Sequence, residues 1–124
     1  MAKFSMAHPL QILKFVWEMN DEHFKICLDT GHSNFFPEVR LNDMVRKMGK
    51  DLKTLHVHDN MADRDFHLWP TKGIIDWPGF VQALKDIDFQ GVFSLETAPD
   101  KTLEGQAYED AFVELCELTK KVIQ

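Results

Sequence analysis

The sequence has little that would mark a secreted, disulfide-stapled or membrane-spanning protein. Its two cysteines, Cys27 and Cys116, show no disulfide or metal-ligand spacing, so we expect buried thiols in a reducing compartment. No run approaches the roughly 18 apolar residues of a spanning helix, and residues 1–10 lack the apolar stretch of a signal peptide. We therefore expect a cytoplasmic protein without a membrane partner.

Positive charge is also scarce. The 20 Asp and Glu residues outnumber the 14 Lys and Arg residues, and the formal net charge is -6. Nucleic acids and anionic membranes are bound through clustered lysine and arginine, so this balance argues against a nucleic-acid partner. A small ligand or a metal ion is more compatible with it.

Three short, mostly apolar segments have the length and residue types of buried strands. They are FKICLD at 24–29, LKTLHVHD at 52–59 and GVFSLE at 91–96. Helical patterns precede each segment, and a fourth follows at 103–123. Strands that alternate with helices pair in parallel through right-handed crossovers. The sequence therefore predicts one α/β domain in the order α-β-α-β-α-β-α.

Proline and glycine predict the helix boundaries. Pro37 is expected to open the second helix and Gly49 to end it, whereas Trp77 and Pro78 begin the third. Residues 59–76 fit no helix or strand and are rich in charged and aromatic side chains. Connections of this length inside a compact domain are usually functional or mobile, so we expect this loop to contribute to a site.

Polar side chains stand at the end of each predicted strand: Asp29 at the first, His56 and His58 at the second, and Glu96 at the third. Because parallel strands end at one edge of their sheet, these side chains are expected to converge. Carboxylates and imidazoles together suit Mn²⁺, Mg²⁺, Co²⁺ or Zn²⁺. Each residue also has a structural interpretation, as a cap, a core histidine or a solvated carboxylate. The coincidence at three strand ends favours a divalent metal site.

The same motifs resemble a known family. CLDTGH, LHVHDN, DFHLWP, TKG, IIDWPGFVQAL and GVFSLE follow the order seen in the xylose-isomerase-like TIM-barrel superfamily, which includes the sugar phosphate isomerase/epimerase family, hydroxypyruvate isomerase, inosose dehydratase and endonuclease IV-type nucleases. The resemblance covers nearly the whole chain. It implies that residues 1–124 form a single C-terminal fragment of a partial (β/α)8 TIM barrel, with three parallel strands equivalent to strands six to eight.

The resemblance implies roles for the strand-end residues. In that superfamily the Asp of a D-x-x-H element, a His at the next strand end and a Glu at the last strand bind metal, which corresponds here to Asp29, His56 and Glu96. His58 lies two residues on, points the same way as His56, and is the alternative ligand. His32 matches a histidine that contacts substrate in epimerases and binds a second metal in the nucleases.

The long loop carries further candidates. Asp65-x-His67 resembles an element that binds extra zinc in the nuclease branch, but it also occurs in other members, so it does not decide the branch. We interpret Asp65 and His67 as possible metal ligands, and His67, Trp69 and Lys72 as candidate substrate contacts alongside His32. The structural alternatives are loop anchoring by Asp65 and His67, packing by Trp69, and a solvated Lys72.

The implied activity is a metal-dependent isomerase or epimerase of a sugar or sugar phosphate. A hydroxy-ketone would react through an enediolate while two carboxylates transfer protons. Glu96 would supply one carboxylate, and His32, the other candidate catalytic residue, would orient substrate oxygen. The family's Glu at the end of strand five, a further metal ligand, would supply the other carboxylate and has no counterpart here, so the chain alone is expected to be weak or inactive.

Two other interpretations stay open. One is a non-catalytic remnant or assembly subunit of the same fold. The other is an endonuclease IV-like zinc phosphodiesterase, which the net charge of -6 and the missing upstream histidines argue against.

Three strands cannot close a barrel, and the two outer ones would leave backbone groups unpaired. We expect a second copy, giving a homo-oligomer, or an N-terminal barrel segment to cover the open side. Several apolar strand residues are expected to point into the unclosed interior, from the set Ile26, Leu28, Leu55, Val57, Phe93 and Leu95.

Overall fold

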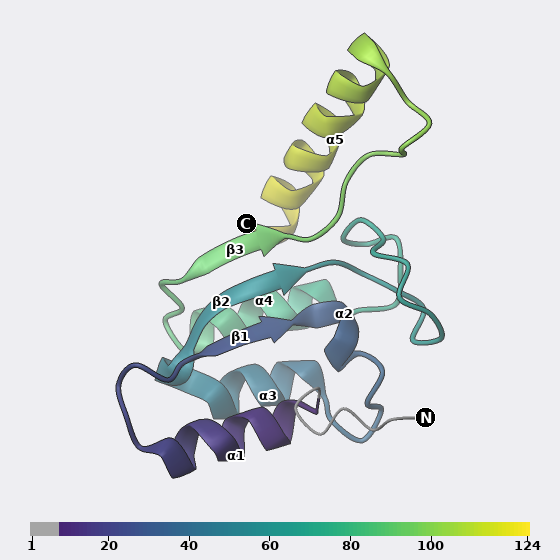
Figure 1. Ribbon diagram of the computed structural model, residues 1–124. Helices are drawn as coiled ribbons and strands as arrows, with labels where there is room; N and C mark the ends of the chain where they lie inside the picture. Colours follow the sequence, from purple (N-terminus) through teal and green to yellow (C-terminus); the bar gives the residue numbers. More distant parts are fainter. Residues whose placement is uncertain (1–7) are drawn as a thin grey trace.

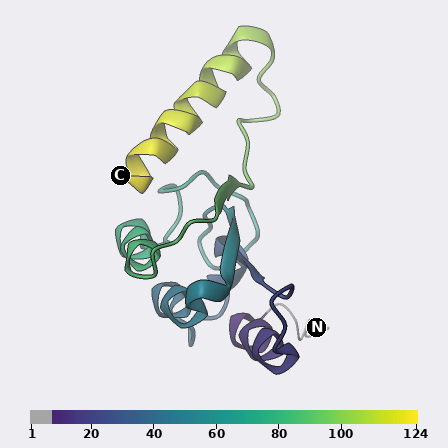
Figure 2. The ribbon, with the colours of Figure 1, turned by 90° about the vertical axis from the view of Figure 1, so that its left-hand side faces the viewer.

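The computed structural model describes residues 8–124, which form a parallel sheet with helices on one face (Figures 1 and 2). The alternation of helices and strands confirms the predicted α/β class. No helix in the described stretch is both long and apolar enough to cross a membrane. The elements in chain order are α1 Pro9–Met19, β1 Ile26–Asp29, α2 Thr30–Ser33, α3 Leu41–Met48, a 3-10 turn at Gly49–Asp51, β2 Leu52–Val57, α4 Trp77–Asp86, β3 Val92–Leu95 and α5 Gly105–Ile123.

The strand order is β1-β2-β3, and both neighbouring pairs are parallel. Asp29 is in register with His56, and Val57 with Leu95. The backbone N–H of Glu96 also donates to the carbonyl oxygen of Val57 at 2.9 Å. The polar ends of all three strands therefore reach the same edge of the sheet, as predicted.

The apolar strand residues face the helices, not an open interior. Ile26, Leu28, Leu55 and Val57 are at most 2% exposed and pack with residues of α1, α3 and α4. Phe93 and Leu95 lie half-buried against the same core. The prediction that several of these six side chains point into the unclosed barrel is therefore wrong. Alternate residues of a strand share one face of the sheet, and the helices cover the face on which these side chains lie.

The opposite face of the sheet carries the strand residues that lie between these buried positions. Cys27 is exposed there, between Ile26 and Leu28, and Cys116 on α5 is half-buried. The prediction of two buried thiols is therefore wrong. Val92 at the start of β3 is 62% exposed. Within the described residues, no helix covers this face.

Local chemistry explains most helix ends. Gly49 ends α3 with a φ of 49°, and the carboxylate of Asp76 accepts a hydrogen bond from the Gly79 N–H at the start of α4, so both predicted boundaries hold. The second predicted helix, however, begins at Leu41 and not at Pro37. The backbone N–H of Val39 closes a turn on Phe36, and residue 40 is extended, so a helix cannot run through this stretch.

Two differences lie next to the site. Helix α2 was not predicted, and it starts at once because the carboxylate of Asp29 accepts a hydrogen bond from the His32 N–H. Strand β2 is shorter than predicted and ends at Val57. Beyond it, the N–H of His58 donates to the hydroxyl of Thr30, and the backbone of Asp59 pairs with the loop instead of a strand.

Helix α5 extends away from the sheet and contacts α4 (Figure 1). Leu115 and Thr119 in its C-terminal half are buried. Tyr108 and Phe112 in its N-terminal half are 37% and 51% exposed. They lie four residues apart on one side of the helix, so this half of α5 presents an apolar surface that no described residue covers.

Candidate metal centre

Donor atoms from all three strand ends meet at the C-terminal edge of the sheet. One ligand atom each from Asp29, His58 and Glu96 lie within 4.8 Å of one another. Nε2 of His58 is 3.0 Å from Oδ1 of Asp29 and 3.9 Å from Oε2 of Glu96. Donors bound to one ion at about 2.0–2.6 Å are separated by at most about 5 Å, so the three are close enough to share a cation.

His56 borders this group from the open face of the sheet. Its Nδ1 is 3.6 Å from Oε2 of Glu96, and its side chain is 48% exposed. His58 is fully buried and also reaches Asp29. Both histidines thus approach the same carboxylate oxygen, and His58 completes the tighter group. The predicted ligand set of Asp29, His56 and Glu96 stays a prediction, and so does the alternative in which His58 is the histidine ligand.

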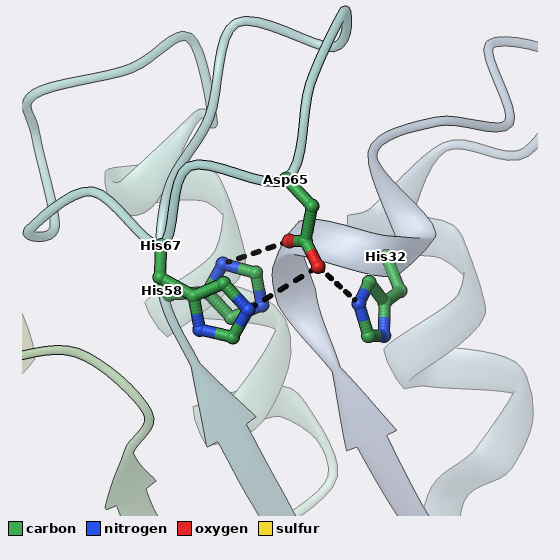
Figure 3. A group of neighbouring side chains, drawn as sticks. All are labelled: His32, His58, Asp65 and His67. Atoms are coloured by element: carbon green, nitrogen blue, oxygen red, sulfur yellow. Dashed lines mark hydrogen bonds and ion pairs between the residues drawn. The ribbon is translucent and has the colours of Figure 1, made fainter.

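A second group of donors lies beside the first. It consists of His32 on α2, His58, and Asp65 and His67 on the long loop, with one ligand atom of each within 4.8 Å of the others (Figure 3). Oδ2 of Asp65 is 2.9 Å from Nε2 of His32 and 3.2 Å from Nε2 of His67. Loop and sheet therefore contribute to one cluster of histidines and carboxylates.

His58 joins the two groups. Its Nε2 faces Asp29, whereas its Nδ1 is 3.9 Å from Oδ1 of Asp65. Nδ1 of His58 and Oε2 of Glu96 are buried and have no hydrogen-bond partner within the described part of the chain. An unpaired buried polar atom costs about 1–3 kcal/mol. A bound cation would give these two atoms the partner that they lack.

His67 is held in one orientation. Its Nδ1 donates to the backbone oxygen of Glu96 at 2.7 Å, so this nitrogen carries the proton and Nε2 faces Asp65. The hydroxyl of Thr97 donates to the carbonyl of His67, whose φ of 48° is uncommon outside glycine. A backbone carbonyl that fixes the tautomer in this way is typical of metal-binding histidines.

The electrostatics keep the carboxylates ionised. Burial raises the pKa of Asp29, but hydrogen bonds from His58 and from the backbone of His32 outweigh it, and the pKa falls to about 2. Burial also opposes ionisation of Asp65, whose pKa is nevertheless lowered by the hydrogen bond and charge of His32. For His67, burial lowers the pKa, and the Glu96 carbonyl and Asp65 raise it overall. Ionised carboxylates next to imidazoles favour a bound cation.

Thr30 and Gly31 form the socket of His58. The buried Thr30 hydroxyl donates to the carbonyl of His58 at 2.7 Å and lies 3.1 Å from its N–H. A Cβ on Gly31 would lie 2.0 Å from Cε1 of the His58 ring. From the sequence alone, these two residues have no role beyond their place in the CLDTGH motif. Their adjacency to Asp29 was the one available signal of this role.

The predicted substrate contacts in the loop have different surroundings. Nε1 of Trp69 donates to the carbonyl of Ala98 at 2.8 Å, which anchors the loop to the chain after β3. Lys72 is exposed. Trp77, just after the loop, is 3% exposed and packs in the core, so it is not available to a ligand. A substrate-binding role for His32, His67, Trp69 and Lys72 stays a prediction.

In this chain, carboxylates and histidines gather beyond the C-terminal ends of a parallel sheet. This places it among the α/β proteins whose ligand sites lie at that edge of the sheet. The family model described as xylose isomerase-like TIM barrel matches residues 1–121. The chain belongs to this family, which confirms the resemblance inferred from its motifs.

Similar proteins include several epimerases. D-psicose 3-epimerase of Enterocloster bolteae is 37% identical over 86 residues, which are 69% of this chain and 27% of that protein. D-psicose 3-epimerase of Clostridium cellulolyticum H10, solved with D-tagatose, superposes with a TM-score of 0.77 and 19% identity, over 95% of this chain and 44% of that one. IolI protein, solved with a zinc atom, superposes with a TM-score of 0.72 and 23% identity, over 92% of this chain and 42% of that one.

The chain thus spans less than half the length of each of these proteins. With three parallel strands and flanking helices, it has the architecture of a partial TIM barrel, as predicted.

Proposed function

We propose that this chain carries the metal-binding and substrate-binding edge of a divalent-metal-dependent sugar or sugar phosphate epimerase or isomerase. The observation that carries the proposal is the convergence of Asp29, His58 and Glu96, with His56 beside them, at one sheet edge. The kinship with D-psicose 3-epimerase supports a ketose as the substrate class.

The donor set fits a divalent metal ion. Carboxylate oxygens suit Mn²⁺ and Mg²⁺, and imidazole nitrogens extend the choice to Co²⁺ and Zn²⁺. The unpaired Oε2 of Glu96 supports a cation at this group, whereas the unpaired Nδ1 of His58 faces Asp65 and supports one at the neighbouring group. When bound, the metal would polarise the carbonyl of a hydroxy-ketone and stabilise the charge that develops as an enediolate forms.

Glu96 is suited to proton transfer. Its side chain is 41% exposed toward the open face, while one carboxylate oxygen is buried against the histidines. His32 is suited to orienting a substrate oxygen, but its two ring nitrogens are 3.1 Å from Asp29 and 2.9 Å from Asp65. A substrate oxygen would reach His32 only after one of these contacts opens.

The chain offers one of the two carboxylates that an epimerase needs on opposite sides of the reacting carbon. Asp29 and Asp65 are engaged by histidines, which leaves Glu96 as the proton-transferring group. The second group would come from outside this chain. We therefore propose that the isolated chain is weak or inactive and that the site is completed by another segment or subunit.

Calorimetry with Mn²⁺ tests the proposal. Wild-type chain should bind the ion, and Asp29→Ala should weaken binding at least tenfold. His23→Ala is the matched control for adventitious histidine binding, because His23 is exposed, lies outside both donor groups and forms hydrogen bonds with Asp21. Equal affinity in the wild type and Asp29→Ala would contradict the proposed site.

The second donor group supports an alternative, a zinc phosphodiesterase of the endonuclease IV type, since two adjacent metals suit phosphodiester cleavage. The net charge of -6 opposes a DNA substrate. Metal-dependent cleavage of abasic DNA, without ketose turnover in the completed enzyme, would favour this alternative. A chain that binds no metal at all would favour the third possibility, a non-catalytic remnant or assembly subunit.

A further inference from the structure

Asp59 has a fully buried carboxylate that accepts four hydrogen bonds from uncharged N–H groups. Oδ1 accepts from the backbone of Asn60 at 2.9 Å and of Ile75 at 3.2 Å. Oδ2 accepts from the backbone of Thr71 at 3.1 Å and from Nε1 of Trp77 at 2.7 Å. The four donors come from both ends and the later part of the loop, so one side chain ties together the segment from residue 60 to residue 77.

The backbone of Asp59 is tied to the same loop. Its N–H and carbonyl both pair with Leu68, each at 2.8 Å, and Leu68 directly follows His67. The loop also passes directly over the carboxylate at Gly73, where an added Cβ would lie 2.2 Å from Oδ1 of Asp59. The segment that bears Asp65 and His67 is therefore wound around one buried residue.

We propose that Asp59 is a positioning residue whose carboxylate sets Asp65 and His67 of the loop against His32 and His58. The functional meaning of this placement rests on the proposed metal centre, but the placement itself does not. Four acceptor positions on a carboxylate match four N–H groups. An asparagine would turn an NH₂ group toward two of these donors. Asp59→Asn therefore breaks the pairing of acceptors with donors while the side-chain volume stays almost unchanged.

The tautomer of the His67 ring can be measured, and it shows whether His67 is held in the position described. Its Nδ1 carries the proton because the Glu96 carbonyl can only accept. Long-range ¹H–¹⁵N spectra of the full chain, labelled at histidine and recorded at alkaline pH without metal or sugar, distinguish this tautomer from the average of an exposed ring. Asp59→Asn should move the two His67 nitrogens to averaged shifts and leave those of His23 unchanged.

Asp76→Ala is the matched control. Asp76 lies at the end of the same loop, and its carboxylate binds Gly79 and Asn42, so its loss should destabilise the fold without changing His67. Unchanged His67 signals in Asp59→Asn, or the same change in Asp76→Ala, would overturn the proposal.

Gly73→Ala provides a second route if Asp59→Asn does not fold. Its methyl group would lie 2.2 Å from Oδ1 of Asp59 and 2.3 Å from the backbone oxygen of Asn60, so it should displace the carboxylate together with the adjoining loop backbone and give the same averaged His67 shifts. An unaltered His67 there would also overturn the proposal. Because neither metal nor sugar is present, a failure of the proposed epimerase function would leave this test unaffected.

Discussion

The rings of His58 and His67 stack face to face, with centroids 3.9 Å apart and planes 2° apart. His58 follows β2 and is fully buried, whereas His67 belongs to the long loop. The stack therefore couples the donors of the sheet to those of the loop. A cation held at one ring nitrogen changes the electrostatic environment of the other ring, so the two donor groups should not behave independently.

The number of bound metal ions should depend on which group is disrupted. His58 belongs to both groups, so two ions can bind together only if its ring loses the remaining proton and bridges them through Nε2 and Nδ1. On that basis we expect two Zn²⁺ ions per wild-type chain at saturation at alkaline pH, and one in either His67→Ala or Glu96→Gln, because each variant removes a donor of one group only. Equilibrium dialysis with metal analysis measures this ratio. A single ion in the wild type that survives His67→Ala would restrict the metal to the strand-end group.

Gly31→Ala should disturb the site through sterics alone. The new methyl group would lie 2.0 Å from Cε1 of the His58 ring, and the backbone of His58 is held by hydrogen bonds to the Thr30 hydroxyl. We expect a loss of about 1–3 kcal/mol of stability, the range for overpacking, together with at least a tenfold loss of metal affinity. Urea unfolding and calorimetry measure the two effects, and wild-type metal affinity in this variant would show that the His58 ring is not a ligand.

The stability of the metal-free chain should fall in acid through Asp29. Its folded pKa of about 2 lies below the ordinary 3.8, so its ionised form stabilises the fold above about pH 4. This contribution is lost as the pH falls through about 2. It amounts to roughly 2 kcal/mol, so Asp29→Asn should be less stable at neutral pH and should decline less steeply between pH 4 and 2. Parallel pH profiles of the two proteins from urea unfolding would contradict this assignment.

Ketose turnover by the isolated chain should be little or none. In the proposed mechanism Glu96 is the one proton-transferring carboxylate among the described residues, and adding metal does not supply a second. Chromatography of D-fructose and D-psicose after incubation with Mn²⁺ measures conversion. Robust epimerisation that disappears in Glu96→Gln would show that this chain is chemically complete.

The chain should associate in solution. Val92 on the open sheet face and Phe112 on α5 are 62% and 51% exposed, and both outer strands have an unpaired edge within the described residues. Sedimentation at micromolar concentration should detect a dimer or larger species, which Phe112→Asp should weaken. A soluble monomer that unfolds cooperatively would refute this expectation.

The parts of the site that could be predicted are those fixed by strand ends. Asp29 and Glu96 close apolar strand segments, and parallel pairing brings such ends together. The choice between His56 and His58 could not be made in this way, because residues two apart point to the same side of a strand. It depends on where β2 ends, and that is determined by a hydrogen bond between His58 and Thr30, which are 28 residues apart.

The alternation of the strands was also predictable, but not which face the helices cover. Ile26 and Leu28 share a face by their spacing, and Cys27 lies opposite. Only the packing of α1, α3 and α4 assigns the core to the first pair. The role of Asp59 was hidden for a similar reason, since its hydrogen-bond donors extend to Trp77 and their convergence depends on the path of the loop.

The donors of both clusters lie between Asp29 and Glu96, at the strand ends, on α2 and on the loop that follows β2. A backbone break or a circular permutation outside this stretch would leave these donors on one polypeptide. The order in which other barrel strands are supplied, or the molecule that supplies them, could change without altering any of the donors on this chain. The proposed cation site would then owe all but its strand-five ligand to one contiguous stretch of sequence, whichever molecule closes the barrel.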